Sequence, residues 1–453
     1  MKTPAPPPDS EKLMSALTQE SSSGRLFEVL MHQQASGAGS EYLPWDKLRY
    51  KTPPTGLTHE EWWLAVKLGR RSVARVIESL HDVEGRAFTY ALPDEVLRGV
   101  DMVNSKASGS ITVSDQVTNP ATRDRYVVSS LIEEAITSSQ LEGASTSRRV
   151  AKEMIRTGRD PKDRSEKMIL NNYLAMRRVA EIARAGSELT PDLICEIHRI
   201  VTDGTLDSPE AAGVIQTVQA ERVSVWGDGD QLLHRPPPVD ELPARIVALC
   251  DFANGTSGPY MPRVLRAITV HFMMGYDHYF EDGNGRTARA VFYWCMLSQG
   301  YWLTEFLTIS KILKEAPSQY AGSFILTEQD DNDLTYFFIY QLRVILRAIE
   351  ELHTFLARKA EELRDLKSSF RAMPGEFNYR QLALLEHAVR NPGAFYTAQS
   401  HATSHDTSNE TARQDLMGLE QRGLLVKSKL HRRFVWTPRP DLSSQLRGEA
   451  DRD

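Results

Sequence analysis

The chain has few cysteines, no long apolar run and no strong net charge, and each of these shortages excludes a class of protein. Its 453 residues include only three cysteines, Cys195, Cys250 and Cys295, and these lie far apart. Such spacing argues against a disulfide scaffold or a paired-cysteine zinc site, and it favours a reducing compartment. The sequence has no apolar run near the roughly 18 residues of a membrane span and no signal-peptide core at its start. We therefore expect a cytoplasmic protein without a membrane partner.

The composition is that of an ordinary globular protein. Lysine and arginine number 54 and aspartate and glutamate number 60, so the formal net charge is −6, and 41% of the residues are hydrophobic. These values exclude a disordered, collagen-like or coiled-coil chain. A mildly acidic total also argues against a chain coated in nucleic acid, although a local basic patch is compatible with it. At roughly 150 residues per domain, the length predicts two to four domains.

Hydrophobic periodicity predicts a mainly α fold built from several regions. The first 45 residues mix proline, serine and glycine, and we expect a flexible N-terminal arm there. Alternating apolar residues around a Gly-Asp-Gly turn predict a β-hairpin at Val214 to Leu233 within the helical body. The expected boundaries are 1–45 for the arm, 46–125 for an N-terminal helical region, 126–145 for a separate helix, 146–345 for the helical core, 346–370 for a linking helix, 371–440 for a C-terminal domain and 441–453 for a polar tail.

The stretch from His278 to Arg289 is the most informative part of the sequence. Asp-Gly-Asn-Gly at residues 282–285 is a turn sequence between two helical patterns, so a tight loop should open onto the N-terminus of a helix. Glycines let backbone N–H groups approach an anion closely, and the helix terminus adds unsatisfied donors and the positive end of its dipole. The pattern therefore predicts a loop that binds phosphate.

Charged side chains flank this loop. Arg286 and Arg289 are three residues apart, so both can offer forked donors to phosphate oxygens from one side of the first helical turn. Asp282 is a hard oxygen ligand that suits a magnesium ion bridging phosphates. His278, whose ordinary pKa is near 6.5, suits a base for a hydroxyl that attacks phosphorus. Together these residues predict transfer of a nucleotide or phosphoryl group from a magnesium-bound polyphosphate to a hydroxyl.

A lone histidine or a bare Gly-x-Gly is more often structural, but here eight positions coincide. They are His278, Phe280, Asp282, Gly283, Asn284, Gly285, Arg286 and Arg289. This stretch resembles the Fic family signature His-Pro-Phe-x-Asp-Gly-Asn-Gly-Arg-x-x-Arg. The similarity extends over about residues 125–345, because the helix with His198, the hairpin with its Pro-Pro exit, Ile309-Ser and Tyr320 also look familiar.

The resemblance implies a Fic-type helical core with a β-hairpin flap, and binding of ATP with Mg²⁺. Most Fic proteins move AMP to a Ser, Thr or Tyr hydroxyl of a target protein, and here the target would bind along the hairpin. By this resemblance, His278 would be the base and Asp282 the magnesium ligand, while Phe280 would pack inward. The remaining positions would bind the nucleotide. The anion-binding loop would consist of Gly283, Asn284 and Gly285, and the outer phosphates would be held by Arg286 and Arg289. Glycine at 285 is unlike the lysine of related kinases.

Two positions depart from the family pattern. Tyr279 replaces the usual proline, which is expected to loosen the turn after His278. Gln216 stands where many relatives have an arginine, in Gly213-Val-Ile-Gln216, and this affects contacts of the target or the nucleotide near the hairpin. Neither change removes a charged group from the loop.

The region upstream of the core suggests self-inhibition. Residues 129–141 form a helical pattern that Gly143 is expected to end, and Ser138 and Glu142 lie four residues apart, hence on one face. On its own such a glutamate is more often solvated. However, Ser-x-x-x-Glu-Gly resembles the inhibitory motif of Fic proteins whose regulatory helix precedes the core. The resemblance implies that Glu142 pairs with Arg289 and takes the arginine that the γ-phosphate would use.

The C-terminal domain resembles a winged helix. Its predicted helices are Phe377 to Val389 and Ser408 to Arg422, followed by short strands at Leu424 to Val426 and Phe434 to Trp436. The leading turn of the second helix and the loop between the strands could contact DNA. The candidate DNA contacts are Ser408, Asn409, Arg413, Lys427, Lys429, Arg432 and Arg433. The alternative is that this domain binds protein or packs against the core.

The sequence thus favours a self-inhibited protein adenylyltransferase with an appended winged helix. Three alternatives stay open. The chain could be a DNA-binding regulator that senses nucleotide at the Fic site, a hydrolase that removes AMP with the same site, or a dimeric interaction scaffold. The identity of the target and the oligomeric state, including a homodimer, cannot be read from the residues.

Overall fold

The chain divides into two compact units, Met1–Leu352 and His353–Asp453, and the boundary falls within one helix, α16 (Thr335–Ala372). The computed structural model describes residues 3–18, 23–33, 41–108, 120–218, 222, 225–226, 232–256, 260–372, 377–391, 393–430, 433–442 and 445–446. The prediction of a mainly α fold is confirmed, with small antiparallel sheets as the exception. Among the helices that the structure describes, none combines the length and apolar character that a membrane span requires.

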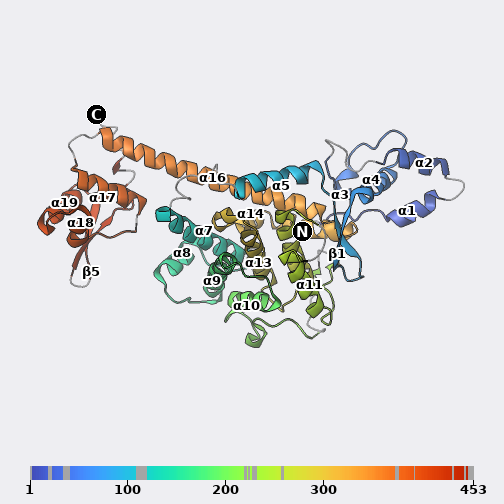
Figure 1. The fold of residues 1–453 in the computed structure, drawn as a ribbon, viewed down its shortest axis with the longest axis horizontal. Coiled ribbons are helices and arrows are strands. Elements are labelled where there is room, and N and C mark those ends of the chain that lie inside the picture. Colours follow the sequence, from blue (N-terminus) through green and yellow to red (C-terminus); the bar gives the residue numbers. More distant parts are fainter. Residues whose placement is uncertain are drawn as a thin grey trace. The chain divides into compact units, whose positions relative to one another are not determined.

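A helix buried on nearly all sides, α13 (Asn284–Ser298), lies at the centre of the first unit (Figure 1). It packs against α9 (Arg164–Arg184), α10 (Pro191–Thr202), α12 (Arg263–Asp277) and α7 (Pro120–Leu141). All ten residues from Thr287 to Met296 are buried, as expected for a helix that is surrounded by others. The core therefore fixes the N-terminus of α13, where the predicted phosphate loop ends.

Shorter elements complete this core. They are α8 (Arg148–Thr157), the 3-10 helices η2 (Pro209–Ala211) and η4 (Trp302–Phe306), α11 (Leu242–Asn254), α14 (Ile309–Glu315) and α15 (Pro317–Gln329). The predicted hairpin is present as β3 (Val225–Trp226) paired antiparallel with β4 (Leu232–His234). Much of the predicted range, including its turn, lies outside the described residues.

The N-terminal region differs from its prediction. Its elements are α1 (Ser10–Leu17), α2 (Ser23–Met31), α3 (Trp45–Leu48), α4 (His59–Val73), β1 (Arg75–His81), β2 (Ala87–Tyr90) and α5 (Asp94–Ala107). The prediction of a flexible arm over residues 1–45 is wrong for α1 and α2, because Val29 of α2 is buried against Leu57 and Leu64. The hairpin β1–β2 was also missed within a region expected to be purely helical.

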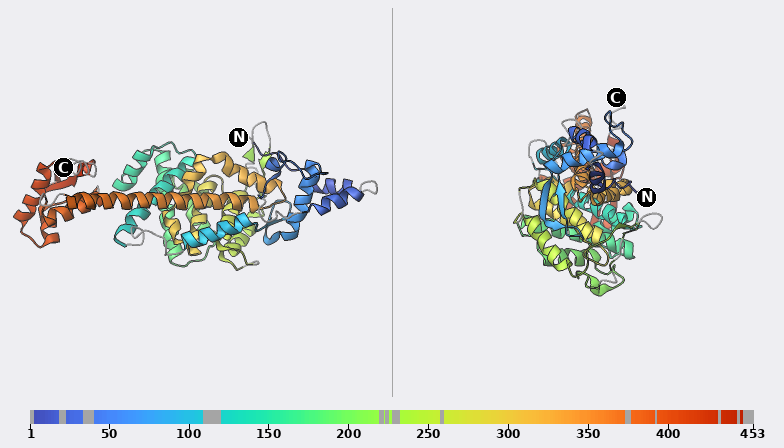
Figure 2. Two further views of the ribbon diagram at one scale, coloured as in Figure 1. Left: turned by 90° about the horizontal axis from the view of Figure 1, so that it is seen from above. Right: turned by 90° about the vertical axis from the view of Figure 1, so that its right-hand side faces the viewer.

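The N-terminal region is anchored to the core through backbone pairing and buried charge. Leu334 donates its N–H to the carbonyl of Thr89 in β2 at 2.8 Å. Lys67 of α4 forms a buried ion pair with Asp330, with 2.6 Å between Nζ and Oδ1. The helix α5 runs beside α16 in both Figure 1 and Figure 2. The two helices are close, because a Cβ atom on Gly99 would lie 3.0 Å from Cδ1 of Leu342. Residues 41–107 therefore form part of the first unit.

In the part of the second unit that the structure describes, the end of α16 is followed by shorter helices and a β-hairpin. These are α17 (Tyr379–Arg390), α18 (Ala398–His405), α19 (Asn409–Gln421), β5 (Leu425–Leu430) and β6 (Arg433–Pro438). The sequence prediction missed α18, whose residues are mostly polar, and made both strands too short. The prediction of a polar tail from 441 is wrong at Leu442 and Leu446, which lie four residues apart and are buried in the core of this unit.

Candidate active site

The predicted loop joins α12 to α13 through two left-handed residues. His278 ends α12 with φ 50° and ψ 59°, and Gly283 precedes α13 with φ 81°. A Cβ atom on Gly283 would lie 2.5 Å from Cγ2 of Thr202, so a larger residue has no room there. The sequence thus folds into a tight turn that ends at the first turn of a buried helix.

Side chains within and beneath the loop fix its shape. The amide of Asn284 accepts the N–H of Phe280 at 2.9 Å and donates to the carbonyl of Phe280 at 2.6 Å. Phe280 is fully buried, and its ring stacks on His198 with 3.7 Å between centroids. Phe280 thus packs inward, as the resemblance implied, while the side chain of Asn284 is used to hold the backbone of the loop.

His198 of α10 supports the loop, a role that the sequence alone did not indicate. Gly213 donates its N–H to Nδ1 of His198 at 2.8 Å, so Nε2 carries the hydrogen and donates to the carbonyl of Asp282 at 2.8 Å. Burial lowers the pKa of His198 to about 4, which agrees with a neutral ring. Residues 198 and 282 are too distant in the sequence for local spacing to reveal this contact.

The candidate base is largely buried at the end of α12. The pKa of His278 is lowered to about 4, mainly by burial; the charges of His234 and Arg222 act in the same direction, and the carboxylate of Glu142 opposes them. The imidazole is therefore neutral over the physiological range of pH. A neutral imidazole is the form that can accept a proton from a hydroxyl.

Both predicted arginines lie in the same site, but their partners differ. Arg286 is almost fully buried, and its Nη1 donates to the carbonyl of Val201 at 3.2 Å. Its Nε has no hydrogen-bond partner among the described residues. The guanidinium of Arg289 is bound by α7, because its Nε donates to Oγ of Ser138 at 2.8 Å and its Nη2 donates to Oε1 of Glu142 at 2.9 Å.

The carboxylate of Glu142 lies over the first turn of α13. A Cβ atom on Gly285 would lie only 2.1 Å from Oε1 of Glu142. Gly143 follows with φ 92° and ends α7, as the sequence predicted. The structure therefore brings Ser138 and Glu142 to Arg289 and places an anionic group at the N-terminus where the sequence predicts phosphate.

A buried glutamate that the sequence analysis missed anchors α7. Glu134 is 1% exposed, and its carboxylate accepts hydrogen bonds from the N–H of Ser310 at 3.0 Å and from the hydroxyl of the same residue. Burial raises the pKa of Glu134. Because Ser310 belongs to the first turn of α14, this contact joins α7 firmly to the far side of the core.

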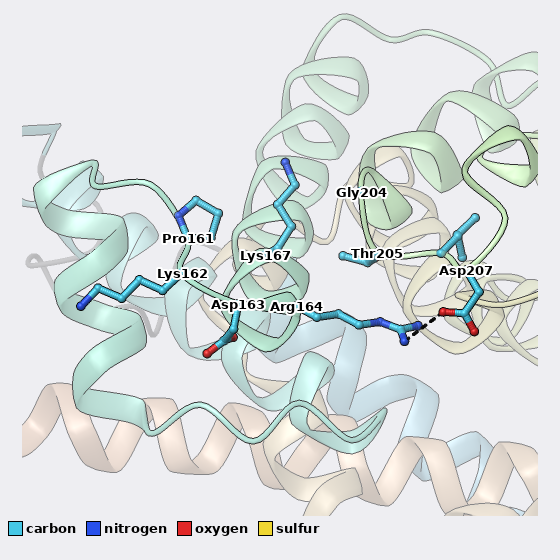
Figure 3. A pocket seen from close by; sticks show the side chains of 9 residues that line it. Pro161, Lys162, Asp163, Arg164, Lys167, Gly204, Thr205 and Asp207 are labelled. Atoms are coloured by element: carbon cyan, nitrogen blue, oxygen red, sulfur yellow. Dashed lines mark hydrogen bonds and ion pairs between the residues drawn. The ribbon is translucent and has the colours of Figure 1, made fainter.

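The predicted magnesium ligand, Asp282, lies at the surface of the site. Its Oδ1 accepts the N–H of Gly283 at 2.6 Å, and its Oδ2 lies 3.7 Å from Nη2 of Arg164. Arg164 also lines a neighbouring hollow of about 330 Å³ and reaches Asp207 there (Figure 3). Among the described residues no group of three or more His, Cys, Asp or Glu side chains could hold a metal ion. A cation at Asp282 would therefore need oxygen ligands from a substrate and from water.

The candidate DNA contacts in the second unit have mixed surroundings. Asn409, Arg413 and Lys429 are exposed. Ser408 uses its hydroxyl to cap α19, and the ammonium of Lys427 lies 4.6 Å from the ring centroid of Phe434. Arg432 lies outside the described residues, and Arg433 belongs to β6, although its side chain is not described.

The geometry of the loop and a family comparison agree on the class of domain. Residues 188–296, which include α12, the loop and most of α13, match the model of the Fic/DOC family. This region of the chain is a Fic domain.

Two curated relatives resemble part of the chain. The protein adenylyltransferase fic-1 of Caenorhabditis briggsae is 26% identical over 148 residues, which are 33% of this chain and 27% of the relative. The protein adenylyltransferase fic-1 of Caenorhabditis elegans is 27% identical over 150 residues, with the same two shares. The chain thus matches about a quarter of the length of these relatives.

Solved Fic proteins resemble the chain at low identity. A Fic family protein from Desulfovibrio desulfuricans G20 has a TM-score of 0.49 and 17% identity, covering 78% of this chain and 98% of that protein. Residues 134–508 of Fic-1 from Caenorhabditis elegans give a TM-score of 0.44 and 19% identity, covering 58% of this chain and 73% of that one.

Proposed function

We propose that the chain is a self-inhibited protein adenylyltransferase that transfers AMP from Mg-ATP to a Ser, Thr or Tyr hydroxyl of a target protein. The observation that carries this proposal is the contact of Glu142 with Arg289 over the first turn of α13, directly after the loop that contains His278 and Asp282. The relatives' name supports the same reaction.

The residues of the site fit a triphosphate and one magnesium ion. The Nε of Arg286 is a buried donor without a partner among the described residues, which suits an anion. Asp282 would hold the cation with one exposed carboxylate, as is usual for Mg²⁺ bound together with phosphates. When bound, Mg-ATP supplies the AMP group and a cation that neutralises phosphate charge.

The chain's own residues then prepare the acceptor hydroxyl. His278 accepts the proton of the hydroxyl as its oxygen forms a bond to the α-phosphorus, and the bond to pyrophosphate breaks. The Asn284 side chain keeps the backbone of the loop in place during this step. Arg286 and Arg289 orient the outer phosphates with forked donors.

Glu142 would inhibit this reaction by competition. Its carboxylate and a γ-phosphate require the same guanidinium, that of Arg289. Low basal activity is therefore expected. A carboxylate in this position could also assist the removal of AMP from a modified target. Incubation of an AMP-modified target with the chain and with the Glu142→Gln variant distinguishes addition of AMP from its removal. Only removal by hydrolysis predicts a loss of AMP that depends on Glu142.

The intact mass of the chain after incubation with ATP and Mg²⁺ tests the proposal directly. The Glu142→Gly variant is expected to gain the mass of one or more AMP groups, and removal of Mg²⁺ with a chelator should abolish this gain. If neither the chain nor added cell proteins gain AMP under these conditions, the proposed reaction is wrong.

The pKa of His278 predicts the pH profile. Since that pKa is lowered to about 4, the base is neutral above this value and is lost only as the pH falls through it. The kcat/KM of the Glu142→Gly variant should therefore be nearly constant between pH 6 and 8, a range derived from the roughly two-unit margin above the pKa. A decline in kcat/KM between pH 7 and 6 would show that the base titrates like an ordinary histidine.

DNA binding by the second unit is a second candidate function, favoured by the exposure of Arg413 and Lys429. If it occurs, Lys429→Ala should weaken binding of the full chain to short duplex DNA and reduce the slope of log K against log salt by about 1. Fluorescence anisotropy at several salt concentrations measures this. Arg439→Ala is the matched control, because Arg439 is exposed but paired with Asp441. Equal salt slopes in all three proteins would contradict this function.

A further inference from the structure

The carbonyl groups at the end of α12 are bound by side chains from the hairpin segment. The final carbonyls of a helix lack partners within the helix. His278 adopts a left-handed conformation at the C-cap, so the helical conformation of α12 stops at this residue. Instead, Nε2 of His234 in β4 contacts the carbonyl of Tyr276 at 2.8 Å, and Nη2 of Arg222 donates to the carbonyl of Asp277 at 2.8 Å.

Arg222 makes the larger share of these contacts. Its Nη1 also donates to the carbonyl of His278 itself, and its Nε and Nη2 donate to the carbonyl of Pro237 at 3.0 and 2.7 Å. The same Nη1 donates to Oε1 of Gln216 at 2.9 Å. One planar guanidinium thus contacts Pro237 in the segment before α11, the end of α12 and Gln216 in the segment that leads into the hairpin.

His234 fixes the other side of the hairpin. Its Nδ1 lies 2.8 Å from Oε2 of Glu328, while Nε2 faces the carbonyl of Tyr276. Both ring nitrogens therefore face oxygen atoms. The N–H of Gln216 completes the arrangement by donating to the carbonyl of Tyr279 at 2.9 Å. Four consecutive carbonyls, from Tyr276 to Tyr279, are thus held by the hairpin segment.

This arrangement accounts for the glutamine at position 216, where many relatives have an arginine. An arginine at this position would bring a cation to the hairpin, and here Arg222 supplies the guanidinium from six residues further along the chain. The amide of Gln216 touches that guanidinium, so the two side chains reach the same place. A cation is favourable at this point because the C-terminal end of α12 carries a partial negative charge.

We propose that Arg222 and His234 are positioning residues that clamp the end of α12 and so hold the His278 imidazole in place for the transfer. The inference rests on the proposed function, because it assigns these residues to the reaction of the same site. Neither side chain belongs to the set that would hold the phosphates. The clamp should therefore control the rate of the transfer step more than the binding of nucleotide.

The test uses the full chain with Glu142→Gly as the active background. Arg222→Ala is expected to lower kcat for AMP transfer by about 10–100-fold, since displacement of a catalytic group by about 1 Å costs on the order of 100-fold. The KM for ATP should change by less than about threefold, because uniform binding is untouched. Arg235→Ala removes a neighbouring exposed cation and should leave both constants unchanged.

Relocation of the guanidinium provides the decisive variant. In Gln216→Arg/Arg222→Ala the arginine at 216 can reach the same carbonyls, so kcat should recover to within about fivefold of the background, a loss of about 1 kcal/mol or less. If Arg222→Ala unfolds, the double variant alone decides the matter. Recovery supports the clamp, and a folded double variant as slow as a His278→Ala variant overturns it. An unchanged kcat in Arg222→Ala also overturns it.

A second readout separates this inference from the proposed function. The imidazole of His278 faces the charges of His234, Arg222 and Glu142, and loss of the Arg222 charge should raise its pKa. Titration of His278 by NMR in the wild-type chain and in Arg222→Ala measures this without catalysis. If Glu142→Gly transfers no AMP, the proposed function fails, and an unshifted His278 titration would show separately that the clamp does not act on the imidazole.

Discussion

Replacement of Glu142 by glycine is expected to raise the rate of AMP transfer by about 10–100-fold. The carboxylate of Glu142 accepts from Nη2 of Arg289 at 2.9 Å, and hydrogen bonds to charged groups contribute about 1.5–3 kcal/mol. Every 1.4 kcal/mol changes an equilibrium constant tenfold. Removal of the Glu142 carboxylate should therefore make Arg289 available to the γ-phosphate about 10–100 times more often. Transfer of label from α-labelled ATP to protein measures the change.

Controls for this prediction follow from the surroundings of Glu142. Glu188→Gly changes an exposed glutamate in another loop and should have no effect. Glu142→Gln keeps the shape but loses the charge, so its rate should lie between those of the wild type and Glu142→Gly. Equal labelling by the wild type and by Glu142→Gly would mean that the contact with Arg289 is structural and does not restrain the reaction.

Replacement of His278 by alanine in the Glu142→Gly background is expected to reduce transfer by about 100- to 10,000-fold, which is the usual contribution of a general base. The imidazole lies at the end of α12, where its lowered pKa keeps it neutral and able to accept a proton. Label transfer under conditions of excess ATP measures the loss of kcat.

Binding of ATP distinguishes loss of chemistry from loss of the site. The His278→Ala variant should still bind Mg-ATP, because the loop is held by Asn284 and His198 rather than by His278. His59→Ala, at an exposed helix N-terminus, is the matched control and should retain activity. Label transfer by His278→Ala at the rate of its parent would assign the base to another residue.

Local sequence was sufficient to predict the loop and the helices that flank it. The turn residues and glycines of 282–285 specify backbone conformations, and Gly283 indeed has a positive φ and no room for a side chain. The pairing of Glu142 with Arg289 joins residues 147 positions apart, and spacing alone could not reveal it. It was predicted only through the resemblance to a family.

Features that depend on distant contacts were missed. The helices α1 and α2 interrupt a Gly- and Ser-rich segment, and both pack against α4. Only the structure revealed the roles of Arg222, His198 and Glu134, because each side chain binds the backbone of a segment that is remote in the sequence. The short helix α18 lacks an apolar stripe, so periodicity could not indicate it.

The burial of Glu134 limits the ways in which the proposed inhibition by Glu142 could be relieved. Because its carboxylate is fixed to the first turn of α14, the helix α7 cannot leave the core without exposing an orphaned N–H and a buried acid. The last turn is held as well, because Ser139 is fully buried and its hydroxyl donates to the carbonyl of Met168 at 3.2 Å. Deletion of α7 should therefore yield an unstable protein rather than a faster one. An activator would have to draw the partly exposed side chain of Glu142 away from Arg289 while α7 stays in place.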